Sequence, residues 1–278
     1  RIWGFENIPE TQISDLMPRQ KNNTLLEKEE RIRDILVNLG LQEVITYRIA
    51  SPENEQLLHD SENGPYVHLA NPITPERSVM RRSLLSSVLE CARNNSRFQQ
   101  RIALFEVGPV YLPPLSSSEN QSNLPAESQR LPIVLSGKRV SLSWANNQSD
   151  SMDYFDIKGI IDELLRAAHI SDYTVEPGNH PSFQPGAIAT LAIHGSQAGF
   201  FGVLHPDVAL NYDFGEHPTL AADFDLTTFT NAMPNHYTIN PIPRFPAIIE
   251  DIALIVDNQI NNAEVVKSII KSGGATLT

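Results

Sequence analysis

The stretch that decides the fold is NPITPERSVMRRSLLSSVLECARNNSRFQQRIALFEVGPVYL, from Asn71 to Leu112. Its first half has the pattern of a capped helix. Thr74 is a suitable N-cap, Pro75 suits the first helical position because its missing N–H is not needed there, and Glu76 meets the positive end of the helix dipole. Apolar residues then recur at helical spacing and predict one buried face: Met80, Leu84, Leu85, Val88, Leu89 and Ala92.

The second half of this stretch predicts a strand. Residues 102–111 are almost continuously apolar, and only Glu106 and the pair Gly108-Pro109 interrupt them. A Gly-Pro pair suits a bend or bulge better than the middle of a ladder. Glu106 lies between Phe105 and Val107, so its carboxylate needs either a hydrogen-bond donor or a solvated cleft.

Working outward, the remaining segments predict further helices and strands. Helices are expected from Thr24 to Gly40, from Asp153 to near His169 and from Asn261 or Asn262 to Ile270. Strands are expected at residues 41–49, 131–136, 139–144, 187–194, 197–204, 219–226 and 250–257. Residues 113–130 have the composition of a surface loop, Gly137-Lys138 that of a tight hairpin turn, and 241–246 that of a proline-rich linker. Consecutive strands with short turns indicate antiparallel pairing, so the expected class is α+β, an antiparallel sheet flanked by helices.

Composition places the chain among ordinary globular proteins. It has 278 residues, 41% of them apolar and 19% charged, and no apolar run long enough to cross a membrane. No secretory signal is recognised at the start of the sequence. The single cysteine, Cys91, has no partner for an internal disulfide, which fits a reducing compartment, so the expected location is the cytoplasm.

The charge distribution is uneven. A net charge of −12 argues against a chain that grips nucleic acid nonspecifically with its main surface. Yet residues 76–102 hold six arginines, at positions 77, 81, 82, 93, 97 and 101. These arginines fit two interpretations, a solvated helix face or a polar subunit interface or channel wall.

Several common catalytic signatures are absent from the sequence. It contains no Walker loop, GxGxxG turn, CxxC pair, HExxH helix or GxSxG elbow. The eight histidines are scattered, and no pair of them is spaced to bind a metal on one helix face. Asp153 and Asp156 lie where a helix begins, so the helix dipole explains them. No metal site is predicted.

Ten blocks in order resemble one family, the beta subunit of bacterial phenylalanyl-tRNA synthetase, over nearly the whole chain. They are RIWGFENIP (1–9), GLQEVITYRI (40–49), NPITPERSVMRRSLL (71–85), NNSR (94–97), LFEVGPVY (104–111), LPAE (124–127), DYFDIKGIIDELL (153–165), HPSFQPG (180–186), GVLHP (202–206) and RFPAIIEDIALIVD (244–257). Ten ordered blocks form a far more specific signal than any single motif.

The resemblance implies a layout. Residues 1–20 would be the tail of a small upstream helical domain of the B5 type. Residues 21–235 would form a catalytic-like domain with a class II aminoacyl-tRNA synthetase fold, and residues 240–278 the first part of a truncated, ferredoxin-like anticodon-binding domain. The implied partners are the alpha subunit, in an alpha2beta2 heterotetramer, and tRNA(Phe). The whole enzyme would use ATP and magnesium. No cofactor is expected in this part of it, and no membrane is expected among its partners.

The resemblance also implies site residues. Catalytic class II cores use a strand-borne arginine against the substrate phosphate, and Leu112 stands at that place here. The degenerate site would comprise Glu106, Gly108 and Leu112, with no catalytic residue and no metal ligand. Neither the glycine-rich third motif, replaced by AADFDL at 221–226, nor the proline of the first motif is found. The expected alpha-subunit interface is Arg77, Arg81, Arg93, Arg97 and Glu43, and the expected tRNA contacts are Arg244 and Phe245.

Two other functions remain open. One is a free-standing class II-like ligase that adenylates a small acid, for which Arg81 or Arg97 would have to supply the arginine over the sheet. The other is a tRNA-binding module that uses the arginine-rich helix. Its affinity would fall with salt, with a log–log slope of about −0.7 to −0.9 per phosphate contact.

Overall fold

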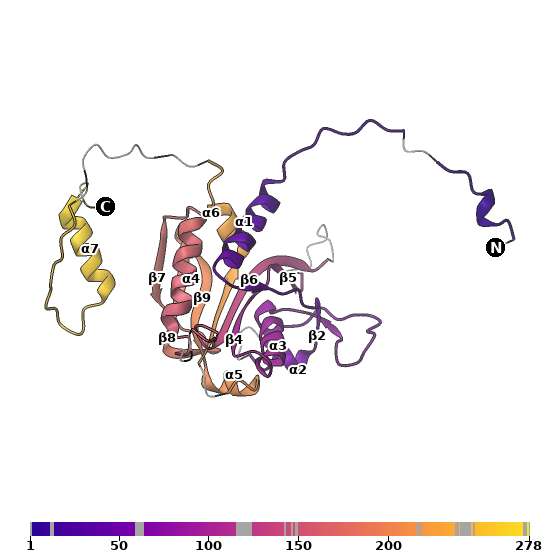
Figure 1. Cartoon of the computed structure of the whole chain (residues 1–278). Coiled ribbons are helices and arrows are strands. Elements are labelled where there is room, and N and C mark those ends of the chain that lie inside the picture. The colour runs from indigo at the N-terminus through magenta and orange to yellow at the C-terminus, as the bar shows by residue number, and fades with distance from the viewer. Residues whose placement is uncertain are drawn as a thin grey trace. The chain divides into compact units, whose positions relative to one another are not determined.

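The computed structural model describes residues 2–11, 14–58, 64–114, 124–141, 143–145, 147, 150–215, 218–236, 239, 246, 248–274 and 277. The chain divides into two compact units, residues 1–237 and 238–278. The first unit holds one large sheet with helices on both faces, and Figure 1 shows its arrangement.

The sheet of the first unit has eight strands in the order β1-β4-β6-β10-β9-β8-β7, with β5 also paired to β6. All pairs are antiparallel except β1 with β4. The expected antiparallel sheet flanked by helices is therefore confirmed. The strands are β1 (Gln42–Glu43), β4 (Arg101–Phe105), β5 (Gly108–Leu112), β6 (Ala126–Gly137), β7 (Tyr173–Pro177), β8 (Phe183–Ile193), β9 (Ser196–Leu204) and β10 (Thr219–Asp225).

Each face of the sheet is buried by its own helices. On one face, α1 (Thr24–Asn38), α4 (Tyr154–Ala167) and α6 (Leu226–Ala232) pack on one apolar cluster that includes Ile32, Ile161 and Phe229. On the other face, α3 (Leu84–Ser96) and α5 (Pro206–Asn211) bury a second cluster that includes Leu89 and Val208. Successive side chains of β6 point to opposite faces of the sheet, so Ile133 belongs to the first apolar cluster and Val134 to the second.

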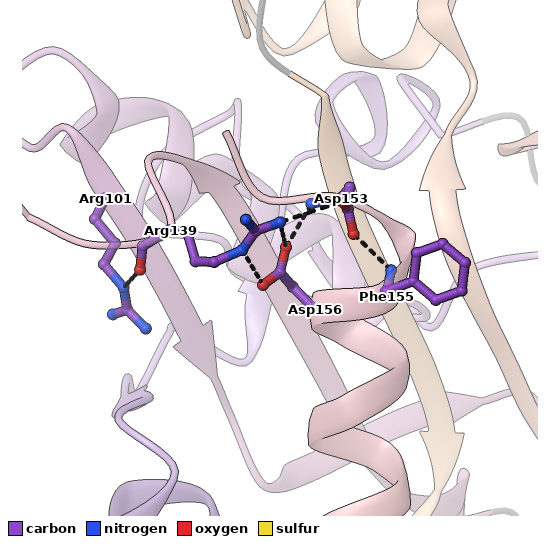
Figure 2. Close-up of polar contacts among 5 residues, drawn as sticks. All are labelled: Arg101, Arg139, Asp153, Phe155 and Asp156. Atoms are coloured by element: carbon purple, nitrogen blue, oxygen red, sulfur yellow. Dashed lines mark hydrogen bonds and ion pairs between the residues drawn. The ribbon is translucent and has the colours of Figure 1, made fainter. Parts of the chain in front are cut away.

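The start of α4 shows how local chemistry sets an element boundary. Asp153 accepts a hydrogen bond from the backbone N–H of Phe155 at 2.8 Å, and Asp156 accepts from the backbone N–H of Asp153 at 2.6 Å. Arg139 bridges both carboxylates, with Nε 2.7 Å from Asp156 Oδ1 and Nη2 3.1 Å from Asp153 Oδ2 (Figure 2). The expected helix start at Asp153 is confirmed.

The hairpin expected at 131–144 is wrong, because its second strand does not form. The described residues of 139–144 form no regular strand, and Figure 2 shows the Arg139 side chain directed at the start of α4. Lys138 instead makes an isolated bridge to Ser151. Strand β6 begins earlier than expected, at Ala126, because residues 126–130 pair with β5 and so shorten the loop expected at 113–130.

The helix expected from Thr74 is also wrong in its start. Helix α3 begins at Leu84, where the Ser83 hydroxyl accepts the N–H of Ser86 at 3.3 Å. Val79 and Met80 form a short strand, β3 (Val79–Met80), that pairs with β2 (Ile49–Ala50). Burial of Val79 and this pairing outweigh the local helix-start signal of Thr74-Pro75.

The strand expected at 41–49 is likewise interrupted. Only its two ends pair, as β1 and β2, and residues 44–48 between them are irregular. A short helix, α2 (Pro52–Glu55), follows directly and packs near the start of α3.

The second unit contains helix α7 (Asn262–Gly273), which confirms the expected helix. The strand expected at 250–257 is wrong, since those residues form no strand and are exposed. The ferredoxin-like assignment therefore stays a prediction, as does the assignment of residues 1–20, where the described part contains only the short 3-10 helix Phe5–Asn7. No helix in the described ranges is both long and apolar enough to cross a membrane.

Candidate functional site

A cleft of about 450 Å³ lies on the α3 face of the sheet, beside the N-terminus of that helix. Strands β5, β6, β9 and β10 form its floor, and the segment before β8 forms part of its wall. Of the three residues expected in a degenerate site, Leu112 lines this cleft while Glu106 and Gly108 do not, and the assignment of that site stays a prediction. Around it the lining is mixed, with Leu84, Val110 and Phe200 beside polar Ser128 and Asn179.

The charged groups of the cleft are engaged within the chain. Arg130 Nη2 lies 2.9 Å from Asp223 Oδ1, and both side chains are about a quarter exposed. Arg82 donates to the carbonyl of Gly64 at 2.7 Å and lies over the Tyr66 ring, 5.5 Å from its centroid. Asp225 accepts from the N–H of Thr227 and so caps α6. Sequence reasoning missed Arg130 and Asp223 as residues of the cleft, whereas Arg82 was among the six arginines that it singled out.

A second cluster, which we call the buried pair, consists of Arg81 and Glu106. Their side chains are 2% and 3% exposed, and Arg81 Nη1 lies 3.0 Å from Glu106 Oε1. Arg81 Nε also donates to the carbonyl of Pro109 at 2.8 Å. Gly108 is part of the same packing, because a Cβ built there would lie 2.6 Å from Arg81 Nη2. Glu106 thus has the donor partner that its apolar neighbours require.

This burial corrects one expected interface residue. Arg81 was expected on the exposed arginine-rich surface, but its guanidinium lies inside the chain, where Glu106 and the Pro109 carbonyl hold it. The other expected interface residues lie nearer the surface. Arg77 pairs with Glu90 at 3.2 Å, Glu43 with Arg33 at 2.9 Å, Arg93 is half-buried and Arg97 is exposed. Arg244 and Phe245 lie outside the described residues.

Thr46 joins the buried pair from the irregular segment 44–48. Its hydroxyl donates to Glu106 Oε2 at 2.6 Å, and its backbone N–H contacts the same oxygen at 3.2 Å. Arg81 Nη1 in turn donates to Thr46 Oγ1 at 3.0 Å. This role could not be predicted from the sequence, because Thr46 fits equally well in an ordinary strand.

Glu55, at the end of α2, is a further buried carboxylate that sequence reasoning missed. Its Oε1 accepts the backbone N–H groups of Arg82 and Ser83, at 2.9 and 3.2 Å, at the start of α3. Burial raises the pKa of Glu55, although those two hydrogen bonds oppose the shift. The signal for it was the run Ser51-Pro52 followed by acidic residues, which is typical of a short capped helix.

Within the ranges that the structure describes, no three His, Cys, Asp or Glu side chains come together in a way that would hold a metal ion.

Comparison with known proteins identifies the family. Residues 8–226 match the family model described as the phenylalanyl tRNA synthetase beta chain CLM domain. The phenylalanine--tRNA ligase beta subunit of Geobacillus kaustophilus is 34% identical over 287 aligned residues, which cover all of this chain and 34% of that protein. The corresponding subunit of Syntrophotalea carbinolica is 31% identical, with 99% of this chain and 34% of that protein covered.

A solved structure supports the fold independently. The pyrrolysyl tRNA synthetase PylSc of Desulfitobacterium hafniense superposes with a TM-score of 0.55 at 15% identity, over 76% of this chain and 71% of that one. The sheet and its helices therefore have the fold of a class II-type synthetase core. The chain spans about one third of the length of the beta subunits it matches. From the match over residues 8–226 and these identities, the chain belongs to the family of phenylalanine--tRNA ligase beta subunits.

Proposed function

We propose that this chain is a noncatalytic scaffold of a phenylalanine--tRNA ligase. It would bind the alpha subunit, in an alpha2beta2 assembly in the cytoplasm, and the alpha subunit would use ATP and magnesium to attach phenylalanine to tRNA(Phe). One observation carries the proposal: the cleft is lined by Leu112, at the place where the resemblance calls for an arginine.

The reason is electrostatic. Adenylation develops negative charge on the transferring phosphate, and an enzyme stabilises it with fixed donors or cations. Leu112 has neither, and Arg130 is already paired with Asp223. A triphosphate in this cleft would also lie near the carboxylates of Asp223 and Asp225, which line it. Both arginines of the lining, Arg82 and Arg130, are engaged within the chain, so the residues present do not fit the phosphates of ATP.

Pyrophosphate exchange tests the proposal. We expect no phenylalanine-dependent exchange by this chain alone, and exchange by the alpha and beta subunits together. An Arg130→Met variant in the assembled enzyme should retain the wild-type rate. Exchange by the chain alone that disappears in Arg130→Met would refute the scaffold and establish a catalytic cleft.

The free-standing ligase is the weaker alternative. It requires Arg81 or Arg97 over the sheet in the cleft, and neither of them is among the residues that line it. Arg81 is buried against Glu106, and Arg97 lines a different cavity at the C-terminal end of α3.

Binding to the alpha subunit is the direct test of the scaffold. We expect a complex on size-exclusion chromatography when the two folded chains are mixed, and two separate peaks would count against it. A tRNA-binding role would instead give an affinity for tRNA that falls steeply with salt. A flat salt response would remove that role.

A further inference from the structure

We propose that the cavity at the C-terminal end of α3 is a binding site for a free ribonucleotide. The base would stack on Phe98, the phosphates would lie between Arg97 and Lys138, and the ribose would donate to Asp213. No described residue lines both this cavity and the cleft beside the N-terminus of α3, so the two sites are separate. The proposal goes beyond the scaffold function and does not depend on it.

The cavity has room for such a ligand. Its volume is about 680 Å³. Residues 96–100, at the end of α3 and just beyond it, form one wall, the end of β6 forms a second, and residues 213–215, which follow α5, form a third. Two buried apolar side chains, Ile102 and Phe214, also line it. Pockets of about 300–1,000 Å³ with a mixed apolar and polar lining are typical of small-molecule sites.

Two cations of this cavity have no ion-pair partner. In the part of the chain that the structure describes, neither Arg97 nor Lys138 lies within salt-bridge distance of a carboxylate, although the whole chain carries a net charge of −12. The helix dipole accounts for a cation at Arg97, the C-cap of α3, but not for Lys138, which directly follows β6. Both are therefore available to phosphate oxygens. Other arginines of the first unit are paired with carboxylates: Arg33, Arg77, Arg81, Arg130, Arg139 and Arg166.

Phe98 supplies an aromatic surface next to these cations. Its side chain is 82% exposed, and its backbone N–H donates to the carbonyl of Asn95 at 2.9 Å. A single exposed apolar residue is common on protein surfaces. An exposed aromatic ring on the wall of a cavity that also holds unpaired cations is the combination that binds a nucleotide, because the ring stacks on the base while the cations contact the phosphates.

Asp213 narrows the class of ligand. Its carboxylate lines the same cavity, so an anion made of phosphate alone would meet a like charge there. A ribonucleotide uses that charge, since a carboxylate accepts a hydrogen bond from the ribose 2′-hydroxyl in many dinucleotide sites. The backbone at this position is held by two hydrogen bonds, from the N–H of Asp213 to the Leu210 carbonyl at 2.9 Å and from the N–H of Phe214 to the Ala209 carbonyl at 3.0 Å.

Contacts within the chain hold the first two walls together. The N–H of Lys138 donates to the carbonyl of Gln100 at 2.8 Å. Gly137 has φ of +84°, and a Cβ at this position would overlap the same carbonyl, so only glycine permits this close approach. Phe98 and Lys138 are thus fixed on adjoining walls before a ligand binds, which lowers the entropic cost of binding.

Calorimetric titration of the chain with ADP, at low salt and in EDTA, tests the proposal. We expect saturable binding by wild type, and at least tenfold weaker binding by Phe98→Ala and by Arg97→Met/Lys138→Met. The matched controls are Phe155→Ala, which removes another exposed phenylalanine, and Lys158→Met/Arg166→Met, which removes two cations of α4. Both controls should bind ADP as wild type does.

A second comparison tests the ribose contact. Wild type should bind ADP at least threefold more tightly than 2′-deoxy-ADP, and Asp213→Asn should reduce this preference. Tighter binding of ADP by Asp213→Asn than by wild type would overturn the ribonucleotide assignment, because the carboxylate would then only repel the phosphates.

Four other results would overturn the site: no saturable binding of ADP, wild-type affinity in either cavity variant, equal binding of inorganic pyrophosphate and ADP, or binding of hexa-adenylate RNA without binding of ADP. The last would mean that the contacts follow a strand instead of filling the cavity. Complex formation with the alpha subunit is measured separately, so failure of this site would leave the scaffold intact, and failure of the scaffold would leave this site intact.

Discussion

Replacing Gly108 with alanine tests how tightly the buried pair is packed. A Cβ at this position would lie 2.6 Å from Arg81 Nη2 and 3.4 Å from Glu106 Oε1. Ordinary contacts begin at 3.4 Å, so the guanidinium would have to move by about 0.8 Å, the difference between 3.4 and 2.6. It has little freedom to do so, because Nε is bonded to the Pro109 carbonyl at 2.8 Å and Nη1 to Glu106 at 3.0 Å.

Two estimates bracket the cost of this substitution. Overpacking of a core by one methyl group costs about 1–3 kcal/mol when the neighbours shift but keep their bonds. Separation of a buried ion pair costs about 3–5 kcal/mol when they do not. Gly108→Ala should therefore lower the free energy of unfolding by at least about 1 kcal/mol. Backbone strain does not contribute, since Gly108 is not among the glycines with positive φ.

Gly159→Ala provides the matched control. Gly159 lies inside α4, is exposed, and has open space where a Cβ would be. The same chemical change there should stabilise the chain by about 0.5–1 kcal/mol. Urea unfolding followed by circular dichroism measures the stability of both glycine variants. The change in stability is calculated from the shift of the unfolding midpoint, provided that the dependence of the free energy on urea is unchanged.

A second control places Gly108→Ala in the Arg81→Met/Glu106→Leu variant. In Arg81→Met/Glu106→Leu the guanidinium that the new methyl would meet is gone, so Gly108→Ala should cost less there than in wild type. The reasoning is refuted if Gly108→Ala lies within about 0.5 kcal/mol of wild type, the size of an ordinary surface change. It is also refuted if the cost is the same in both backgrounds.

Three further predictions follow from other contacts. Glu55→Gln keeps the oxygen that accepts the backbone N–H groups of Arg82 and Ser83 and removes a buried charge, so at pH 8 it should be at least as stable as wild type. Glu55→Ala removes that oxygen and should lower the free energy of urea unfolding by about 1–3 kcal/mol. Because burial raises the pKa of Glu55, the folded state holds the Glu55 proton to higher pH than the unfolded state does. The free energy of unfolding of wild type should therefore fall as the pH rises from the unfolded-state pKa of Glu55 to its folded-state pKa. Glu55→Gln should lack this pH dependence. Asp153→Ala should lower the free energy of unfolding by about 0.5–2 kcal/mol through loss of the α4 cap, and a variant as stable as wild type would contradict that role. Leu112→Arg should leave binding to the alpha subunit unchanged and create no pyrophosphate exchange in the isolated chain; loss of binding would show that cleft and interface are not separate.

Elements with strong local signals were predictable from sequence. Helix α4 has a capping box and a long apolar stripe, and β8 and β9 are apolar runs separated by a short turn, so nearby residues alone determine them. The start of α3 was not predictable, because Thr74-Pro75-Glu76 is an equally good local start. Pairing of Val79 with Ala50, remote in the sequence, decides the outcome.

The candidate site also contains residues that the local sequence predicts and residues that it does not. Glu106 stood out in the sequence because a charge in an apolar strand requires a partner. Its partner Arg81 was assigned to a helix face, since the helix was expected to begin before it. Thr46 lies 60 residues from Glu106 along the chain, and nothing about a threonine in a strand-like run indicates a contact at that separation. Leu112 lines the cleft, and its assignment to a degenerate site comes from the family resemblance alone and stays a prediction, because an apolar strand residue carries no local signal of such a role.

Strand β5 contributes to both the buried pair and the cleft. Its first residues serve the buried pair, with Gly108 making room for the guanidinium and Pro109 accepting from it. Its last residues, Val110 and Leu112, line the cleft. Because the buried pair and the cleft use opposite ends of one strand, we expect Leu112→Arg to change the charge of the cleft without breaking a contact of Arg81 or Glu106.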